Sequence, residues 1–220
     1  MVIAHQFETQ ARNMVETQLR PRGIRDERVL EAMQLVPRHE FVRADLLGAA
    51  YDDRPLPIGE RETISQPYIV AAMTQAARVA PGDIALEIGG GSGYQAAILA
   101  HLAATVYSIE INPVLAERAR ERLARLGYGN VEMIAGDGSE GLAAHAPYDV
   151  VIVSAATPHL SPILLGQLAE GGRLVAPVGN MRYQELLLLS KQGGQITTQH
   201  LDPCQFVPLY GKGGWPETRE

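Results

Sequence analysis

Several features that would mark a particular class of protein are missing from this 220-residue sequence. Its single cysteine, Cys204, cannot form an intramolecular disulfide, which fits a reducing compartment. Acidic residues outnumber basic ones, 25 to 19, and this balance argues against a general nucleic-acid partner. Residues 1–20 lack the apolar core of a signal peptide, and no apolar run approaches the ~18 residues of a membrane span. The sequence therefore predicts a soluble, cytoplasmic protein with neither a nucleic-acid nor a membrane partner.

Metal sites and repeat architectures are not indicated either. The six histidines are scattered without the short spacings of metal ligands, so we expect no metal site. The sequence shows no internal repeat, and its hydrophobic content of 46% is enough for a sizeable core. We predict a single domain over residues 1–220, with residues 1–68 as a helical and substrate-loop region and residues 69–220 as a cofactor-binding α/β core.

The spacing of apolar residues predicts the order of helices and strands. Residues 8–47 have helical spacing interrupted at Pro21-Arg22-Gly23 and at Pro37, and residues 48–68 are rich in turn residues. A helix is expected from residue 69 to the Pro81-Gly82 turn. The elements expected beyond it are strands 84–88, 105–110, 131–135, 149–153 and 173–178, helices 93–102, 113–126 and 161–169, a short helical stretch near 139–144, and strands 184–190 and 195–201 around the hairpin signal Gln192-Gly193-Gly194.

This alternation predicts an α/β fold. Its doubly wound, mostly parallel sheet carries helices on both faces and ends in an antiparallel C-terminal strand pair, with an N-terminal helical extension. Such an arrangement is typical of S-adenosylmethionine-dependent methyltransferases.

The most informative motif is a glycine-rich turn after an apolar segment. The segment 84–88 leads into Gly89-Gly90-Gly91-Ser92-Gly93, and Ala- and Leu-rich residues follow. This order predicts a strand, a tight turn and a helix, the layout of a nucleotide-type cofactor site. A dinucleotide fingerprint built on Gly89 and Gly91 requires glycine at position 94, where the chain has Tyr94. The pattern through Gly93 instead favours a cofactor without a pyrophosphate, and S-adenosylmethionine is the leading candidate.

Three acidic residues are placed where such a cofactor needs them. Glu110 ends the strand after the glycine turn, the position that meets ribose hydroxyls in nucleotide-type folds. Asp137 and Gly138 follow the next strand, where a carboxylate can accept from the adenine amine and an N–H can reach a ring nitrogen. Glu87, directly before the glycines, is assigned to the methionine ammonium, because a charge in a buried strand otherwise lacks a reason.

Beyond these features, nearly the whole chain resembles protein-L-isoaspartate O-methyltransferases. The block Thr63-Ile64-Ser65-Gln66-Pro67-Tyr68 is highly specific to that family, whereas the glycine turn is shared across the methyltransferase superfamily. The resemblance is carried by Gln18-Leu19-Arg20 with Gly23-Ile24, Val36-Pro37-Arg38 with Phe41-Val42, Ala50–Asp53 with Leu56–Gly59, Thr63–Tyr68, Leu86–Ala97, Gly136–Gly138, Ala155–Pro158, Glu170–Val175 and Phe206–Leu209.

The resemblance implies methyl transfer from S-adenosylmethionine to the free α-carboxylate of L-isoaspartyl residues in damaged proteins. It makes Ser65 the active-site residue, places Thr63, Gln66 and Tyr68 with it at the substrate, and places Ile64 at the cofactor. We interpret Ser65 as a group that holds and aims the acceptor carboxylate and not as a nucleophile. Ile64 and Tyr68 are expected to help exclude water. A monomer that repairs isoaspartyl proteins in the cytoplasm is the leading hypothesis.

Several residues depart from the family pattern, among them His159 and Ser161 in the loop after Ala155-Ala156. Gly90 stands where the glycine turn commonly has threonine, and Glu62 replaces a usual glutamine before Thr63. Glu62 is expected either to repel an anionic acceptor or to point to solvent. Gln205 replaces a usual arginine before Phe206. We expect these departures to bear on substrate range more than on the type of reaction.

Alternative functions follow from the same features. The changes at Glu62 and Gln205 leave room for a dedicated enzyme that methylates an aspartate in one partner peptide. A nicotinamide-dependent oxidoreductase is disfavoured by Tyr94 and by the acceptor block. A cofactor-binding module without activity is disfavoured because Ser65, Glu87, Glu110 and Asp137 are all present.

Overall fold

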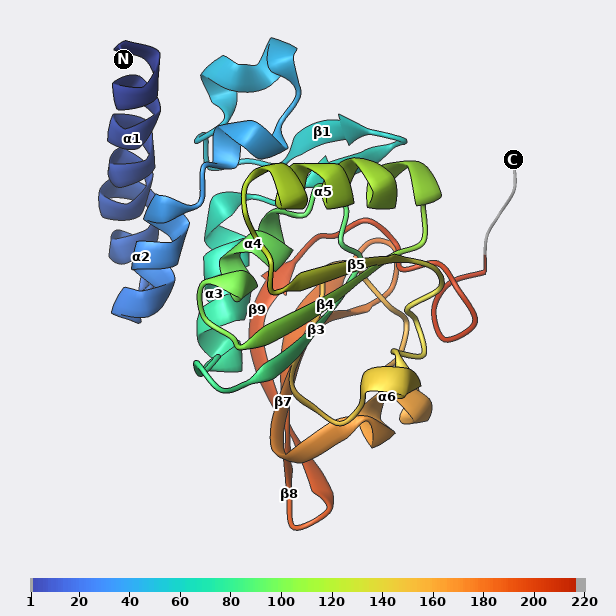
Figure 1. Cartoon of the computed structure of the whole chain (residues 1–220). Helices are drawn as coiled ribbons and strands as arrows, with labels where there is room; N and C mark the ends of the chain where they lie inside the picture. Colours follow the sequence, from blue (N-terminus) through green and yellow to red (C-terminus); the bar gives the residue numbers. More distant parts are fainter. Residues whose placement is uncertain (1, 217–220) are drawn as a thin grey trace.

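Seven strands form one sheet in the order β5-β4-β3-β6-β7-β8-β9 (Figure 1). The computed structural model describes residues 2–216 of the chain. The sheet strands are β3 (Ile84–Ile88), β4 (Thr105–Glu110), β5 (Val131–Ala135), β6 (Tyr148–Val153), β7 (Leu168–Gly179), β8 (Gln184–Gln192) and β9 (Gln195–Cys204). The pairs from β5 through β7 are parallel, and β8 and β9 are antiparallel to their neighbours. The predicted mixed sheet with an antiparallel C-terminal pair is confirmed.

Alternate residues of the central strands bury side chains on opposite faces, as strand geometry requires. On one face, Ala85, Val150 and Ile152 join a core with the helices α1 (Val2–Met14), α2 (Glu27–Leu35), α3 (Pro67–Ala77), α4 (Tyr94–Ala100) and α5 (Pro113–Arg125). On the other face, Leu86 and Val151 pack with the short helix α6 (Pro162–Gly166). Helices therefore cover both faces, but unequally. The near-continuous apolar runs of β3 and β6 reflect this two-sided burial.

The N-terminal helical extension packs on the face of the sheet that also carries α3, α4 and α5 (Figure 1). Helix α1 continues into a π-helical turn, Val15–Leu19, and a 3-10 turn, Arg20–Arg22, which ends at Gly23 with φ of +91°. Helix α2 begins after Asp26, whose side chain accepts from the Arg28 N–H at 3.0 Å and so caps the first turn. The expected breaks at Pro21–Gly23 and at Pro37 are both present.

The structure differs from the expected elements in three places. Residues 56–64 were expected to be part of a turn-rich connection, but they include a hairpin of β1 (Leu56–Gly59) and β2 (Glu62–Ile64). These strands are too short to show the alternation of apolar and polar residues that predicts a strand. The expected helix 161–169 ends at Gly166, because Leu168 already pairs with Tyr148 of β6. Residues 139–144 form no α-helix, and only a 3-10 turn, Ala143–His145, follows. The single domain over residues 1–220 stays a prediction, and residues 1 and 217–220 lie outside the described residues.

Candidate active site

The glycine turn joins β3 to α4 at the carboxyl edge of the sheet. Gly89, Gly91 and Gly93 have φ of +87°, +52° and +85°, a region that disfavours every residue with a Cβ. The N–H groups of Gly89 and Gly90 donate to the Ile109 carbonyl at 2.8 and 3.1 Å. This fixes the turn against the end of β4. The alternate glycines are thus required by backbone conformation, which explains the pattern in the sequence.

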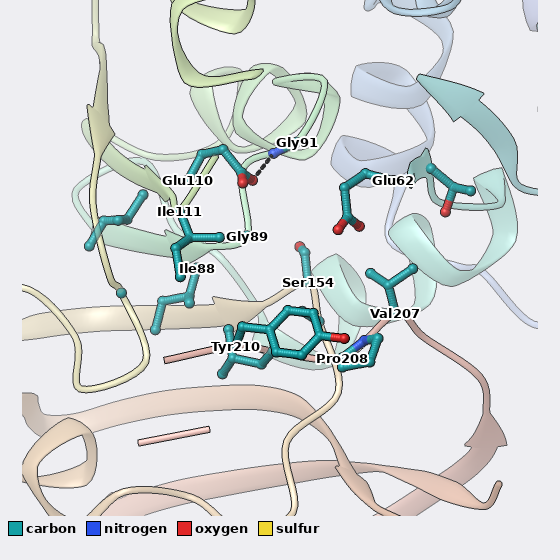
Figure 2. Close-up of a pocket in the computed structure, with 15 residues that line it drawn as sticks. Glu62, Ile88, Gly89, Gly91, Glu110, Ile111, Ser154, Val207, Pro208 and Tyr210 are labelled. Atoms are coloured by element: carbon teal, nitrogen blue, oxygen red, sulfur yellow. Dashed lines mark hydrogen bonds between the residues drawn. The ribbon is translucent and has the colours of Figure 1, made fainter. Parts of the chain in front are cut away.

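One cavity lies between this turn, the end of β4 and the C-terminal loop (Figure 2). Glu110 is buried at its edge, and its carboxylate accepts from the Gly91 and Asn112 N–H groups, both at 2.8 Å. Each carboxylate oxygen keeps a second lone pair for a ligand hydroxyl. Gly138 and Ile111 also line the cavity. Glu110 and Gly138 therefore lie where a ribose and an adenine were expected from the sequence.

A second cavity continues along the other side of the glycine turn. It is lined by Gly89, Gly91, Ile64 and Glu87, among others. Glu87 is fully buried, with Oε2 accepting from the Ser108 hydroxyl at 2.6 Å and Oε1 left without a partner. Burial raises the pKa of Glu87 to about 8. An orphaned buried acceptor at a cavity wall fits a ligand cation, which is the ammonium that the sequence assigned to Glu87.

Two expected cofactor residues do not line either cavity. The Asp137 carboxylate accepts from the Ser139 hydroxyl at 2.6 Å and from the Lys212 N–H at 2.9 Å, and so fastens the C-terminal loop. Gly93 faces α5, where an added Cβ would lie 3.2 Å from Leu123 Cδ1. The geometry thus lends no support to the adenine contact assigned to Asp137, and it gives Gly93 a conformational and packing role.

A third cavity, of about 510 Å³, opens beside the acceptor block. It brings together Thr63, Ser65, Gln66 and Tyr68, the four residues assigned to substrate, and Gln205 also lines it. Its volume falls in the range of ligand pockets, roughly 300–1,000 Å³. The sequence block that resembles the family thus forms one wall of a single cavity.

A buried arginine, Arg38, binds the backbone of the acceptor block Thr63–Tyr68. It was not singled out in the sequence analysis. Arg38 is 0% exposed, and it donates from Nη2 to the Ser65 carbonyl at 2.7 Å and from Nε to the Ala50 carbonyl at 2.8 Å. Its guanidinium also lies over the Tyr94 ring, 4.7 Å from the centroid. Burial lowers the pKa of Arg38. Arg38, a residue of the N-terminal region, therefore holds the Ser65 backbone in place.

The three cavities meet at two residues. Thr63 and Ser154 each line all three of them. Ser154 directly follows β6, beside the central strand β3, and Figure 2 shows its hydroxyl pointing into the cavity. A strand end at this edge is a usual place for a functional residue, so its position was the available signal. A ligand that fills the first two cavities must pass this junction and face the third.

The first two cavities have acidic residues but no basic ones in their lining. Glu62, Glu87 and Glu110 are the acidic residues, and none of the lining residues is Lys, Arg or His. Figure 2 shows the Glu62 carboxylate directed into the cavity, so the expectation that it points to solvent is wrong. Such a surface favours a cationic ligand and offers nothing to a pyrophosphate.

Gly90 differs from its neighbours, because its φ is not positive. An added Cβ would lie 2.6 Å from Ser108 Oγ, the hydroxyl that donates to Glu87, and 3.0 Å from Met133 Cε. In this chain Ser108 and Met133 thus occupy the space that a side chain at position 90 would need.

We expect Gly90→Ala to lower the free energy of unfolding by about 1–3 kcal/mol through overpacking. Ser108→Ala removes the closest clashing atom, so Gly90→Ala should be less damaging in that background. Urea unfolding of the wild type, both single variants and the double variant measures the coupling. Additive changes would show that Ser108 does not fill the space at position 90.

The described residues show neither a metal cluster nor a membrane helix. Over residues 2–216, no group of three or more His, Cys, Asp or Glu side chains is arranged to hold a metal ion. No helix in the same part of the chain is both long and apolar enough to cross a membrane.

Comparisons with known proteins agree with this geometry. Residues 9–214 match the family described as protein-L-isoaspartate(D-aspartate) O-methyltransferase. Protein-L-isoaspartate O-methyltransferases of Koribacter versatilis and Methanoculleus marisnigri are each 55% identical to the chain, over 94% and 92% of it and over 93% and 92% of their own lengths. A solved structure from Plasmodium falciparum, assigned to the same activity and holding S-adenosyl-L-homocysteine, is 25% identical with a TM-score of 0.79, covering 93% of this chain and 98% of its own. The chain therefore belongs to the protein-L-isoaspartate(D-aspartate) O-methyltransferase family.

Proposed function

We propose that this protein transfers the methyl group of S-adenosylmethionine to the free α-carboxylate of L-isoaspartyl residues in damaged proteins and peptides. The observation that carries the proposal is the junction at Thr63 and Ser154. The sulfur of the cofactor links its adenosine to its methionine, so a cofactor that spans the two acidic cavities has its sulfonium methyl at this junction. The third cavity then brings an acceptor to the methyl group. We further propose that the protein acts as a monomer in the cytoplasm.

The chemistry explains why the site needs no general base. A carboxyl group with a pKa of about 3.5–4 is almost fully ionised at pH 7, so no proton has to be removed before it attacks. The carboxylate oxygen bonds to the methyl carbon as the carbon–sulfur bond breaks, and both charges disappear in the ester and thioether products. The neighbouring backbone nitrogen then attacks the methyl ester, methanol leaves and a succinimide forms, and hydrolysis of this ring returns some normal aspartate. Alignment and exclusion of water are the contributions left to the protein.

The residues divide these tasks according to their positions. Glu110 accepts from the ribose hydroxyls, Glu87 binds the methionine ammonium, and the Gly138 N–H reaches the adenine. Ile64 packs beside the methionine part. Ser65, held by Arg38, directs the acceptor carboxylate, and Thr63, Gln66 and Tyr68 form the wall against which the peptide lies.

The acidic cofactor cavities also separate this proposal from a nicotinamide-dependent oxidoreductase. A dinucleotide carries a pyrophosphate, whereas Glu62, Glu87 and Glu110 are the acidic residues on these walls. S-Adenosylmethionine has two cationic groups and one carboxylate, so its net charge is complementary. Titration with S-adenosylhomocysteine and with NAD should therefore show binding of the first and not of the second.

Ser65→Ala is expected to lower kcat for an isoaspartyl peptide by about 10–100-fold, the worth of one hydrogen bond to a charged group. Binding of S-adenosylmethionine should stay within about twofold, because Ser65 directs the acceptor. Steady-state kinetics and calorimetric titration of the cofactor separate the two effects. Intact turnover in the variant would remove Ser65 from the mechanism.

The proposed reaction is tested with methyl-labelled S-adenosylmethionine and a pair of peptides that differ only in an isoaspartyl or a normal aspartyl residue. Label on the isoaspartyl peptide alone is the expected result. Label on the aspartyl peptide alone would support a dedicated aspartyl methyltransferase, for which Gln205 in the lining of the third cavity is the relevant feature. Label on neither peptide would contradict the proposed acceptor.

A further inference from the structure

Glu62 is a carboxylate without a protein partner on the wall of the first cavity. It belongs to β2 and is half-buried, and no hydrogen bond or ion pair joins its side chain to another described residue. Figure 2 shows its carboxylate directed into the cavity, across from Glu110. Burial and the charge of Glu110 raise the pKa of Glu62 to about 7. A pair of facing acidic groups with no cation between them favours a positively charged ligand.

The position of Glu62 shows which part of the ligand it faces. The next residue, Thr63, is one of the two that line all three cavities, so Glu62 stands at the edge of the junction. Figure 2 shows that its carboxylate and the hydroxyl of Ser154, the second junction residue, both point into the cavity. The methionine ammonium is separately accounted for by Glu87. The cationic group that remains for Glu62 is the sulfonium.

We propose that Glu62 makes the cofactor site selective for charge at sulfur, so that it holds the sulfonium of S-adenosylmethionine in preference to the neutral thioether of S-adenosylhomocysteine. This inference rests on the proposed function, because it takes the cofactor and its product as the two ligands. They differ by one methyl group and one positive charge. A carboxylate beside the sulfur therefore loses its electrostatic attraction when the methyl leaves, and product release is favoured.

The same charge has a consequence for the reaction. The sulfonium charge that Glu62 stabilises diminishes in the transition state, so this interaction is stronger in the ground state and does not accelerate transfer. Glu62 also repels the approaching acceptor carboxylate. Removal of the charge should therefore raise the rate of methyl transfer and lower the KM for the acceptor, while inhibition by the product becomes stronger.

The test is direct calorimetric binding of both ligands, without acceptor, to the wild type, Glu62→Gln and Glu60→Gln. Glu60 is a matched control, because it lies in the turn of the same hairpin, is exposed and pairs with Arg118 at 3.6 Å. We expect Glu62→Gln to reduce the preference for S-adenosylmethionine over S-adenosylhomocysteine by about 10-fold, the scale of one partly screened charge pair. Glu60→Gln should leave the preference unchanged.

Equal weakening of both ligands in Glu62→Gln would overturn the inference, since it would indicate a structural role. Failure of the wild type to bind either ligand would instead contradict the proposed function. Loss of methyl transfer to isoaspartyl peptide, with the expected binding ratios intact, would leave the inference standing and correct only the acceptor.

A second readout is the pH dependence of the binding preference. The groups that face Glu62 are Glu110 from β4 and Tyr210 from the C-terminal loop, while Arg118 of α5 is paired at the far end of the hairpin. The wild-type preference for S-adenosylmethionine should increase from pH 6 to 8 as Glu62 ionises, and Glu62→Gln should show no such increase. Titration of Glu87 or of the ligand ammonium affects both affinities equally, because both ligands carry the same ammonium. These effects therefore cancel in the ratio of the two affinities. A flat wild-type ratio would contradict the inference.

Discussion

Glu87→Gln is expected to weaken binding of S-adenosylmethionine by about 10–100-fold, the worth of a hydrogen bond between charged groups. Glutamine keeps the shape of the side chain but cannot supply the negative charge that the ammonium meets at Oε1. Calorimetric titration at pH 8 measures the loss. Glu132→Gln, at an exposed position of β5, is a matched control that should bind like the wild type. Equal affinity of Glu87→Gln and wild type would exclude Glu87 from the cofactor site.

The same variant should change how the stability of the unliganded protein depends on pH. Burial holds the pKa of Glu87 at about 8 in the folded state, against about 4.5 when unfolded. Between these two pKa values the folded protein binds more protons than the unfolded protein. The contribution of Glu87 protonation to the unfolding free energy is therefore complete below about pH 4.5 and is lost as the pH rises to about 8. The difference in unfolding free energy between wild type and Glu87→Gln should decrease by a few kcal/mol from pH 5 to pH 8.

Urea unfolding at several pH values measures this difference directly. The lowered pKa values of His39 and His101 make the unfolding free energy rise with pH, which is opposite to the effect of Glu87. Both histidines are present in both proteins, so their contributions cancel in the difference. Glu62 is likewise common to both proteins. A difference that stays flat from pH 5 to pH 8 would show that Glu87 is ionised in the folded, unliganded protein and would contradict a raised pKa.

Arg38→Met should both destabilise the protein and impair catalysis. Methionine fills much of the volume but leaves the buried Ala50 and Ser65 carbonyls without their donor, which should cost about 2–4 kcal/mol of unfolding free energy. Freed from Arg38, the Ser65 backbone loses its fixed position, so kcat should fall at least about 10-fold. The affinity for S-adenosylmethionine should change much less. Urea unfolding, kinetics at a temperature where the variant is folded, and cofactor titration report these three quantities.

Two further variants test whether these effects are specific to the contacts of Arg38. Arg54→Met removes an exposed arginine that pairs with Asp52 at 3.2 Å and should leave stability and kcat nearly unchanged. Arg38→Lys keeps the charge and one donor and should recover part of the stability and less of the turnover. A loss of stability with full kcat in the folded variant would mean that Arg38 does not position Ser65.

The parts of the site that could be predicted from sequence are those fixed by local chain geometry. Gly89 and Gly91 were identifiable because a turn from strand to helix imposes positive φ on them, and Glu110 because it ends the following strand. The acceptor block was found by resemblance, since serine before proline by itself indicates only a helix start.

The remaining features depend on contacts between distant segments. Arg38 is separated from Ser65 by 27 positions, and nothing in Val36-Pro37-Arg38 shows that its guanidinium is buried. The partners of Asp137 lie in its own turn and in the C-terminal loop, so its position after a strand suggested a ligand contact that the geometry does not support. Glu62 could not be placed without the β1–β2 hairpin, which directs it to Glu110.

In the proposed mechanism the methyl group is transferred at the junction of Thr63 and Ser154, and Ser65 directs the acceptor. The most direct test is a crystal structure of the protein with S-adenosylhomocysteine and an isoaspartyl peptide. We expect the sulfur to lie beside Thr63 and Ser154. The peptide α-carboxylate should lie in the third cavity, hydrogen-bonded at Ser65 and facing the sulfur. A peptide carboxylate bound away from Ser65, or a sulfur outside the junction, would contradict it.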